Sequence, residues 1–347
     1  MVSFCEGELV MSNLFKLVLI KNDQSAQYDI TPVIGSLSWD NDFTLTTALE
    51  FDVAVSDARF PTPESIMALG DMVVLTKGSD EIFRGVIVNE SRKGRSPRSY
   101  VAYDFSWLLN QSKIVIQFNN ISATQAITQV LEKFGLEIGS IPSMPTLIDK
   151  VYIQETPGKI IQDIIDLVEK REGYTLNGEM REGKIYLEKR KDLVIKGSFQ
   201  LAENIAPEDV TAAVSEPNRT LSIEEMRNSI KIMVEEEETQ YEITAEAKDD
   251  ELIGQYGLLE EVIKIDAEDA AKSRQAAKII LARLGRVHET INLKLPGDIR
   301  FRAGYLFDIK EPVTGINGRF IIVSAKHKVE RQVHTMDLEL SLPGDVV

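Results

Sequence analysis

Three histidines are the side chains of this 347-residue chain best suited to acid–base or metal chemistry: His288, His327 and His334. All three fall in segments whose alternating apolar residues predict β-strands. His327 and His334 stand seven residues apart, which places them on opposite faces of one regular strand. No cysteine or further histidine stands at metal-ligand spacing. We therefore expect structural or surface histidines and no metal site.

The sequence also lacks the motifs of nucleophilic catalysis and of phosphate binding. The single cysteine, Cys5, has no neighbouring base and is a poor candidate for a catalytic thiol. There is no Gly-Lys-Ser/Thr phosphate loop, no Gly-x-Ser-x-Gly and no His-Glu-x-x-His. Asp163 and Asp166 share one side of a predicted helix. A glycosidase needs two facing carboxylates, but we expect these two to lie on a solvated helix face instead. We expect no catalytic residue, no cofactor and no enzymatic activity.

Composition narrows the class of protein. The balance of 39 basic against 55 acidic residues gives a net charge of −16, which argues against general or sequence-specific nucleic-acid binding. One cysteine permits no intrachain disulfide, so the cytosol is a suitable place to fold. The apolar run from Leu14 to Ile20 is too short to span a bilayer, and no cleavable signal surrounds it. We expect neither export by a leader peptide nor membrane insertion.

Two charged segments are candidate contact surfaces. Glu235, Glu236, Glu237 and Glu238 begin an acidic stretch at a predicted hairpin tip, which is either a solvated turn or a wall that repels polyanions. Basic residues surround Gly94 at another predicted tip: Arg92, Lys93, Arg95 and Arg98. Given the acidic net charge, we expect this tip to contact an acidic partner or a neighbouring subunit rather than nucleic acid.

The elements that carry these residues predict an α+β, β-rich protein in three parts. Residues 1–112 are rich in strands. Residues 113–198 form a small α/β domain in which Ser122 and Thr156 cap two helices that pack with a hairpin. The stretch from Ala206 to Thr220 is interpreted as a linker. Residues 199–347 form a β-rich barrel or sandwich with one long helix, capped by Asp266 and closed by Gly285.

An internal similarity links the two outer parts. Gly70 opens an apolar strand that is followed by a turn and a second strand with an internal Gly85. Gly304 opens the same pattern, with Gly318 in the second strand. The pattern raises the hypothesis of two related barrels that flank the middle domain.

With these residues in place, the chain resembles the central hub proteins of contractile tails, the late-control protein D type of phages, Gram-positive prophages and phage-tail-like bacteriocins. The resemblance covers nearly the whole chain. It is carried by these residues: Ser38-Trp39-Asp40, Leu69-Gly70-Asp71, Ile82-Phe83-Arg84-Gly85, Ala102-Tyr103-Asp104, Leu108-Leu109, Tyr256-Gly257, the helix with Ala267, Ala270, Ala271, Ala277 and Leu284, and the strand after Gly304.

The resemblance implies two barrels similar to the tail-tube fold in each chain and a homotrimeric ring that joins a sixfold tail tube to a threefold spike. The implied partners are the tube protein, the spike protein, other baseplate proteins and the tape-measure protein. Such a hub is made in the bacterial cytoplasm and then resides in the baseplate. Some hub proteins of this type carry a fused lysozyme or peptidase module. We expect no such module within this chain, up to Val347. Tyr256 and Gly257 join the charged segments as candidate channel or interface residues.

Two other functions stay open at this point. A cell-wall-degrading tail enzyme would act on peptidoglycan through an acidic residue. A freestanding β-rich module would be monomeric and would bind carbohydrate or protein without a tube or spike.

Overall fold

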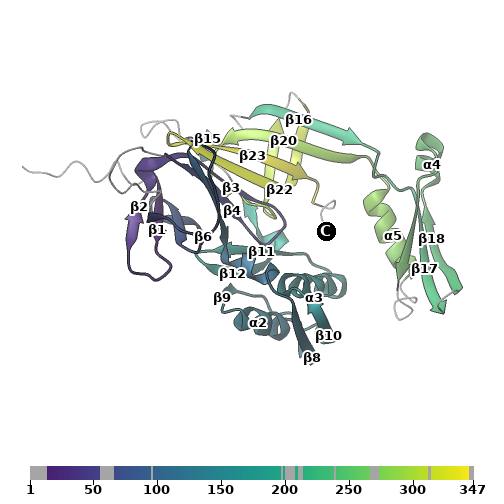
Figure 1. The fold of residues 1–347 in the computed structure, drawn as a ribbon. Coiled ribbons are helices and arrows are strands. Elements are labelled where there is room, and N and C mark those ends of the chain that lie inside the picture. The colour runs from purple at the N-terminus through teal and green to yellow at the C-terminus, as the bar shows by residue number, and fades with distance from the viewer. Residues whose placement is uncertain are drawn as a thin grey trace, which may run out of the picture.

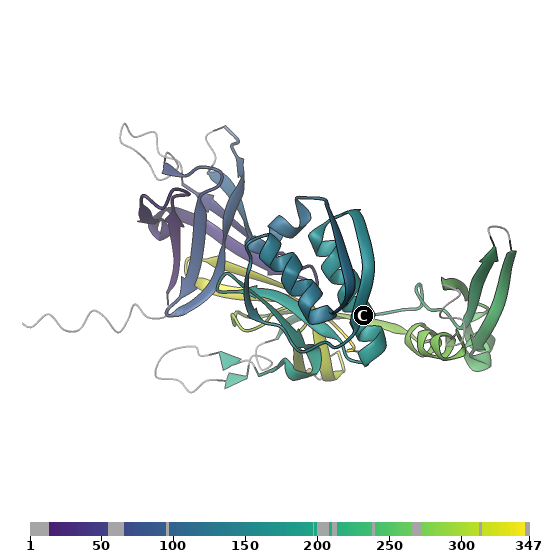
Figure 2. The same cartoon turned by 90° about the horizontal axis from the view of Figure 1, so that it is seen from below.

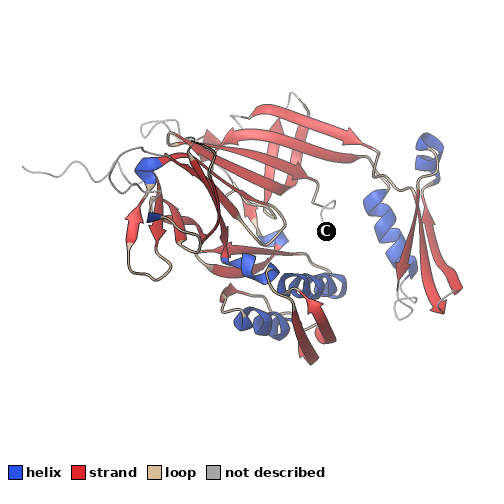
Figure 3. Ribbon diagram, in the orientation of Figure 1, coloured by secondary structure: helices blue, strands red, loops and turns tan. Residues whose placement is uncertain are grey.

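The computed structural model describes residues 14–54, 66–94, 97–196, 198–199, 208–209, 214–237, 240–265, 273–311 and 314–343. These residues are rich in strands, with α-helices confined to two places and short 3₁₀ turns elsewhere (Figure 3). Strands from both ends of the chain lie side by side in one large curved sheet (Figure 1). A domain with α2 and α3 lies against this sheet, and a small module with α4 and α5 stands apart from it (Figures 1 and 2).

The N-terminal strands form what we call the first repeat. Alternation explains why they pack: in β4, Leu49, Phe51 and Val53 are buried, while the residues between them face outward. Around them lies a core of aromatic and branched side chains that includes Trp39 and Tyr100. The bounds are β1 (Phe15–Ile20), β2 (Gln27–Asp29), β3 (Ile34–Asn41), β4 (Ala48–Val53), β5 (Met72–Lys77), β6 (Asp80–Ser91) and β7 (Arg98–Asp104), with short 3₁₀ turns at Thr31–Val33 and Phe105–Asn110.

The C-terminal strands form the second repeat, which has its own core around Leu293, Phe307 and Leu338. Its longest strand, β22, is long enough to pair with different neighbours at its two ends. The bounds are β13 (Val194–Ile195), β16 (Ser215–Ser222), β20 (His288–Pro296), β21 (Leu306–Glu311), β22 (Ile316–Glu330) and β23 (Val333–Ser341). The short pair β14 (Ser198–Phe199) and β15 (Glu208–Asp209) lies outside this sheet.

The two repeats share one hydrogen-bond register. The backbone N–H of Gly70 donates to the carbonyl of Ile87 at 2.8 Å, and that of Gly304 donates to the carbonyl of Ile322 at 2.8 Å. Both glycines have a left-handed φ, 89° and 83°. The β6 and β22 strands then carry a bulge at the same place, between Ile87 and Asn89 and between Ile322 and Ser324.

The match continues strand by strand across each repeat. From β6 to β3 the paired residues are Ile87, Ala102, Leu49 and Trp39, and from β22 to β16 they are Ile322, Leu340, Ile291 and Arg219. We call residues related in this way register equivalents. The internal similarity seen in the sequence is therefore a duplicated strand frame.

The arrangement of the two repeats differs from the expected pair of separate barrels. Their strands form a single 13-stranded sheet with the order β16-β20-β23-β22-β3-β4-β7-β6-β5-β1-β2, to which β21 and β13 add beside β22. Among the described strands no barrel closes on itself. The predicted linker is also partly wrong, because β16 begins at Ser215. Proline usually argues against a strand, but Pro217 lies in an edge strand at a register shift, where proline is tolerated.

The middle domain places two helices between two small sheets. The predicted capping box of Ser122 and Gln125 is present, and Thr156 caps the second helix ahead of Pro157. The apolar faces of both helices meet Phe118 and neighbouring side chains in one core. The bounds are β8 (Ile114–Ser122), α2 (Ala123–Lys133), β9 (Glu137–Ser140), β10 (Leu147–Glu155), α3 (Pro157–Glu172), β11 (Leu176–Arg181) and β12 (Lys184–Lys189), followed by a 3₁₀ turn at Arg190–Asp192.

Residues 229–284 form the side module, which is inserted between β16 and β20. Its three-stranded sheet is not hydrogen-bonded to the large sheet. One face of this sheet is covered by α5, where Ala277 packs on Ile230 and Ile232. The predicted helix start at Asp266 lies outside the described residues. The bounds are β17 (Ser229–Glu237), β18 (Gln240–Lys248), α4 (Asp250–Tyr256), β19 (Glu260–Ile265) and α5 (Ser273–Leu284).

We predict that Gly304→Ala destabilises the protein more than Gly315→Ala. Both residues are left-handed, so either change costs about 1 kcal/mol of backbone strain. A Cβ on Gly304 would also lie 1.8 Å from the side chain of buried Asn177, whereas the nearest atom at Gly315 is 3.7 Å away. The added clash costs roughly 1–3 kcal/mol. Thermal unfolding of both variants measures the difference, and equal midpoints would contradict the close packing at Gly304.

Candidate functional site at the junction of the two repeats

One strand pair joins the two repeats. The C-terminal half of β22 runs antiparallel to β3, with Ala325 opposite Asn41, Lys326 opposite Asp40 and Glu330 opposite Ser36. The same half of β22 pairs on its other side with β23. The junction is therefore a continuous part of the sheet, with its backbone groups satisfied on both sides.

An aromatic cluster fills the core side of this junction. The ring of His327 stacks on Trp39 at 4.7 Å with an interplanar angle of 6°. His334 approaches the same tryptophan at 5.2 Å, and Phe15 packs edge-on against His334. These side chains come from β22, β3, β23 and β1, so both repeats contribute to the cluster.

The prediction that His327 and His334 lie on opposite faces of one strand is wrong. A turn at Arg331–Gln332 separates β22 from β23, and the two rings meet side by side in the hairpin. Nδ1 of His327 lies 3.0 Å from Nε2 of His334, and Nε2 of His327 lies 2.9 Å from the carbonyl oxygen of Phe301. Because a carbonyl only accepts, Nε2 of His327 carries the proton and Nδ1 accepts from His334.

Burial holds both histidines uncharged. It lowers the pKa of His327 to about 4, since water cannot reach the imidazolium. Burial and the neighbouring His327 together lower the pKa of His334. The Nδ1 atom of His334 is buried without a hydrogen-bond partner, so an added proton would find no acceptor there. The two histidines are thus uncharged, buried side chains that pack in the core of the junction.

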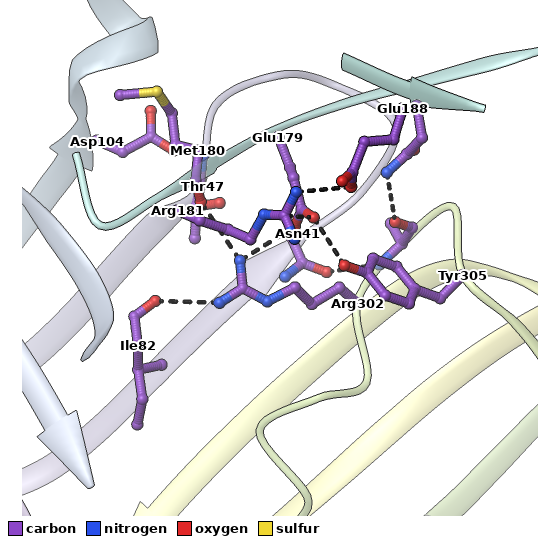
Figure 4. A network of polar contacts seen from close by, with 12 residues as sticks. Asn41, Thr47, Ile82, Asp104, Glu179, Met180, Arg181, Glu188, Arg302 and Tyr305 are labelled. Atoms are coloured by element: carbon purple, nitrogen blue, oxygen red, sulfur yellow. Dashed lines mark hydrogen bonds and ion pairs between the residues drawn. The ribbon is translucent and has the colours of Figure 1, made fainter. Parts of the chain in front are cut away.

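Next to this aromatic cluster, a polar network ties the middle domain to both repeats (Figure 4). Glu179 on β11 accepts from Tyr305 at 2.8 Å and from Arg302 at 3.1 Å. Arg302 also reaches the carbonyl oxygen of Ile82 in the first repeat, at 3.5 Å. Burial and Glu179 raise the pKa of the Tyr305 hydroxyl, which keeps it protonated as a donor.

Two asparagines complete this network. Asn41, at the end of β3, accepts from the backbone N–H of Ala303 at 2.9 Å. Asn177 on β11 donates to the carbonyl oxygen of Ala303 at 3.4 Å. The loop that carries Arg302, Ala303 and Tyr305 is thus held by the first repeat and the middle domain at once. The hollow beside the network has a volume of only about 10 Å³, which leaves no room for a ligand larger than water.

The basic tip predicted from sequence lies just beyond the end of β6. Arg92 is exposed and pairs with Glu90 at 2.6 Å, and Lys93 is also exposed. Arg95 lies outside the described residues. Glu90 and Arg92 are the register equivalents of Ala325 and His327, which pair with β3 at the junction. The basic tip therefore occupies, in the first repeat, the place that the junction occupies in the second.

The other predicted residues lie in the side module, away from the junction. The backbone of Glu235, Glu236 and Glu237 ends β17, while their side chains and Glu238 lie outside the described residues. Tyr256 ends α4, and Gly257 closes it with a left-handed φ of 85°. The carbonyl of Gly257 accepts from the buried Asn228 at 2.7 Å, which ties α4 to β17.

The candidate acidic pair makes structural contacts. Asp163 accepts from Lys150 at 2.8 Å and from Tyr152 at 2.5 Å, and Asp166 accepts from Gln162 at 2.8 Å. Although burial raises it, these hydrogen bonds lower the pKa of Asp163 below its usual value. Asp163 is thus held as a carboxylate. Within the described residues, no cluster of three His, Cys, Asp or Glu side chains could hold a metal ion. None of the described helices is long and apolar enough to cross a membrane.

Comparison with known proteins identifies the family. A family model described as YQBQ-like matches residues 37–341, which include the first repeat from within β3 onward, the middle domain, the side module and the second repeat. The chain belongs to the YQBQ-like family. No curated protein matches its sequence.

Solved structures of tail proteins have the same fold as this YQBQ-like chain. The 43 kDa tail protein of prophage MuSo2 from Shewanella oneidensis is similar with a TM-score of 0.67 and 14% identity, over 96% of this chain and 100% of that one. A tail protein from Neisseria meningitidis MC58 gives 0.65 and 10%, over 95% and 97%. Prophage tail protein gp18 from Listeria monocytogenes EGD-e gives 0.57 and 10%, over 93% and 94%.

The histidine pair predicts an acid-sensitive junction. Unfolded histidine binds a proton near pH 6.5 but folded His327 does so only near pH 4, so stability is complete above pH 6.5 and falls as the pH drops to 4. The loss is about 3 kcal/mol for His327. A double variant with His327→Gln and His334→Gln should show a flatter dependence of unfolding midpoint on pH over this window. The wild-type protein, unfolded over the same pH range, is the control.

The polar network predicts that Glu179→Ala and Asp308→Ala lower the stability of the protein by different amounts. Glu179→Ala leaves the partly buried Arg302 and Tyr305 without this carboxylate acceptor and should lower the free energy of unfolding by about 2 kcal/mol. Asp308→Ala removes an exposed, solvent-screened ion pair with Arg319 and should cost clearly less. Urea unfolding of the two variants measures both losses. Similar losses would show that the network contributes no more than a surface ion pair.

Proposed function

We propose that this YQBQ-like chain is a structural hub of a contractile phage tail or tail-like particle, in which three copies form a ring between the tail tube and the spike. The observation that supports it most directly is the duplicated strand frame, whose two halves join edge to edge through β22 and β3. A chain that joins its own halves in this way has the surfaces needed to join further copies. The fold shared with prophage tail proteins agrees with this role.

The two ends of the frame carry complementary edges. Within the described strands, β16 pairs only with β20, so its outer edge is open. The end of β6, from Asn89 on, pairs with β7 on one side only. By register equivalence, β16 corresponds to β3 and this part of β6 corresponds to β22. An open edge attracts another strand, and pairing β16 of one copy with β6 of the next repeats the internal junction between copies.

The charges near these edges fit such a pairing. Arg92 and Arg219 are the register equivalents of the stacked His327 and Trp39. Each arginine already has a carboxylate partner, with Arg92 at 2.6 Å from Glu90 and Arg219 at 2.7 Å from Glu289. The pairing would therefore bring together two neutralised ion pairs. The basic tip at Arg92 and Lys93 would lie at a contact with a neighbouring subunit.

In a three-copy ring, six repeats would face the sixfold tube and three chains would face the threefold spike. Tube, spike, other baseplate proteins and the tape-measure protein are the proposed partners. The chain would be made in the bacterial cytoplasm and then stay in the baseplate, with a mechanical and not an enzymatic role. The acidic residues from Glu235 to Glu238 remain candidates for a channel surface that repels polyanions.

The proposed ring can be tested with single-cysteine variants made in a Cys5→Ser background. Ser91 and Thr220 are the register equivalents of Lys326 and Asp40, which face each other at the internal junction. We expect a mixture of Ser91→Cys and Thr220→Cys chains to form a disulfide-linked dimer on mild oxidation. Light scattering should give three times the chain mass of 38.9 kDa for the unmodified protein.

The positive control is a chain with both Lys326→Cys and Asp40→Cys, which should close a disulfide within one chain. Each single variant oxidised alone should give no dimer, because the paired positions differ. A protein that stays monomeric at high concentration, and whose mixed variants do not cross-link while the positive control does, would contradict the proposed ring.

A further inference from the structure

An exposed apolar surface continues the core of the second repeat beyond its end. Leu221 lies near the end of β16, Ile223 follows the last residue of that strand, and Val287 lies immediately before β20. Leu221 is 57% exposed, Val287 37% and Ile223 40%. Alternation places Leu221 on the face that carries Ile291, a fully buried core residue. We call Leu221, Ile223 and Val287 the apolar tip.

In the first repeat, the corresponding positions contact other parts of the chain, although Phe43 is itself 36% exposed. Leu221 is the register equivalent of Asn41, and counting on along the chain beyond the paired strands makes Ile223 and Val287 correspond to Phe43 and Leu45. Leu45 packs on the core of the middle domain, and the ring of Phe43 lies 5.1 Å from the Arg190 guanidinium. Asn41 accepts from the backbone N–H of Ala303 in the second repeat at 2.9 Å. Asn41 and Leu45 therefore contact the second repeat and the middle domain, whereas Leu221 and Val287 are exposed.

The position that should face Leu221 is also bare. Asn41 contacts Ala303 across the internal junction, and Ala303 directly precedes Gly304. Its register equivalent is Leu69, which directly precedes Gly70. Ala303 is buried at 6% exposure, whereas Leu69 is 59% exposed. An asparagine and an alanine make the internal contact, and two exposed leucines occupy the matching positions.

Leu69 and Leu221 cannot meet within one chain. They belong to different repeats, and β16 lies at the far end of the sheet from β5, which Leu69 precedes. Pairing β16 of one copy with β6 of the next, however, would place Leu221 against Leu69 in the same relation as Asn41 and Ala303. Two leucines that are exposed in one chain would then lose their contact with water.

We propose that the apolar tip of one copy binds Leu69 of a second copy, with Leu221 against Leu69 as its central contact; this inference rests on the proposed ring. The internal Asn41–Ala303 contact is a hydrogen bond from a backbone amide. The contact between copies uses apolar burial in its place. The same chain thereby distinguishes its internal junction from the junction with its neighbour.

Mixed single-cysteine variants test the contact directly in the full-length Cys5→Ser chain. Leu69→Cys chains mixed with Leu221→Cys chains should give a cross-linked dimer with a short bis-maleimide, and neither variant alone should do so. Leu147→Cys is the matched control, since Leu147 is 50% exposed on β10, away from this surface. Its mixture with Leu221→Cys should give no dimer.

Charge substitution supplies a second readout. Leu69→Asp or Leu221→Asp alone should weaken self-association about tenfold or more, while Leu147→Asp leaves it unchanged. A chain that carries both Leu69→Asp and Leu221→Lys should recover part of the self-association lost in Leu69→Asp, because every contact between copies then joins opposite charges. Circular dichroism of each variant checks that the fold is retained.

The outcomes separate this inference from the proposed ring. If Ser91→Cys and Thr220→Cys cross-link but Leu69→Cys and Leu221→Cys do not, the ring stands and the leucine contact is overturned. If neither mixture cross-links, the ring fails and the leucine contact fails with it.

Discussion

The pairing of β22 with β3 is the constraint on which the rest of the structure depends. It turns two copies of one strand frame into a single sheet, and it fixes which residues of the first repeat meet the second. The stacked Trp39 and His327, and the loop around Ala303, take their positions from this pairing. Without it, the middle domain would have two separate partners instead of one continuous support.

The aromatic cluster and the polar network stabilise the junction by different physical means. In the cluster, His327 and His334 are kept neutral by burial and share a hydrogen bond, so the pair adds no charge to an apolar region. In the network, Glu179 binds Arg302 and Tyr305, so that a partly buried carboxylate is satisfied by several donors. The side chains that stabilise the internal junction are thus absent from the register-equivalent positions at the end of β6 and on β16.

The same frame carries different insertions at equivalent places. Between β3 and β4 the chain makes a short loop that docks on the middle domain, whereas between β16 and β20 it adds the whole side module. The apolar tip lies at the base of this module. A duplicated frame with unequal insertions can present alternate surfaces around a ring. This property suits the proposed role as an adaptor between a sixfold and a threefold partner.

Local chemistry in the sequence determined much of the secondary structure. The caps at Ser122 and Thr156 and the alternation in β4 and β20 act within a few residues, so they are readable without a fold. The glycines at 70 and 304 revealed the duplication, because each opens a strand pair with the same spacing. Only the tertiary structure decided that β22 pairs with β3, that His327 meets His334 across a hairpin, and that β16 is a strand despite Pro217. Alternation shows which face of a strand is buried, but the partner strand is chosen by packing between residues that lie hundreds of positions apart.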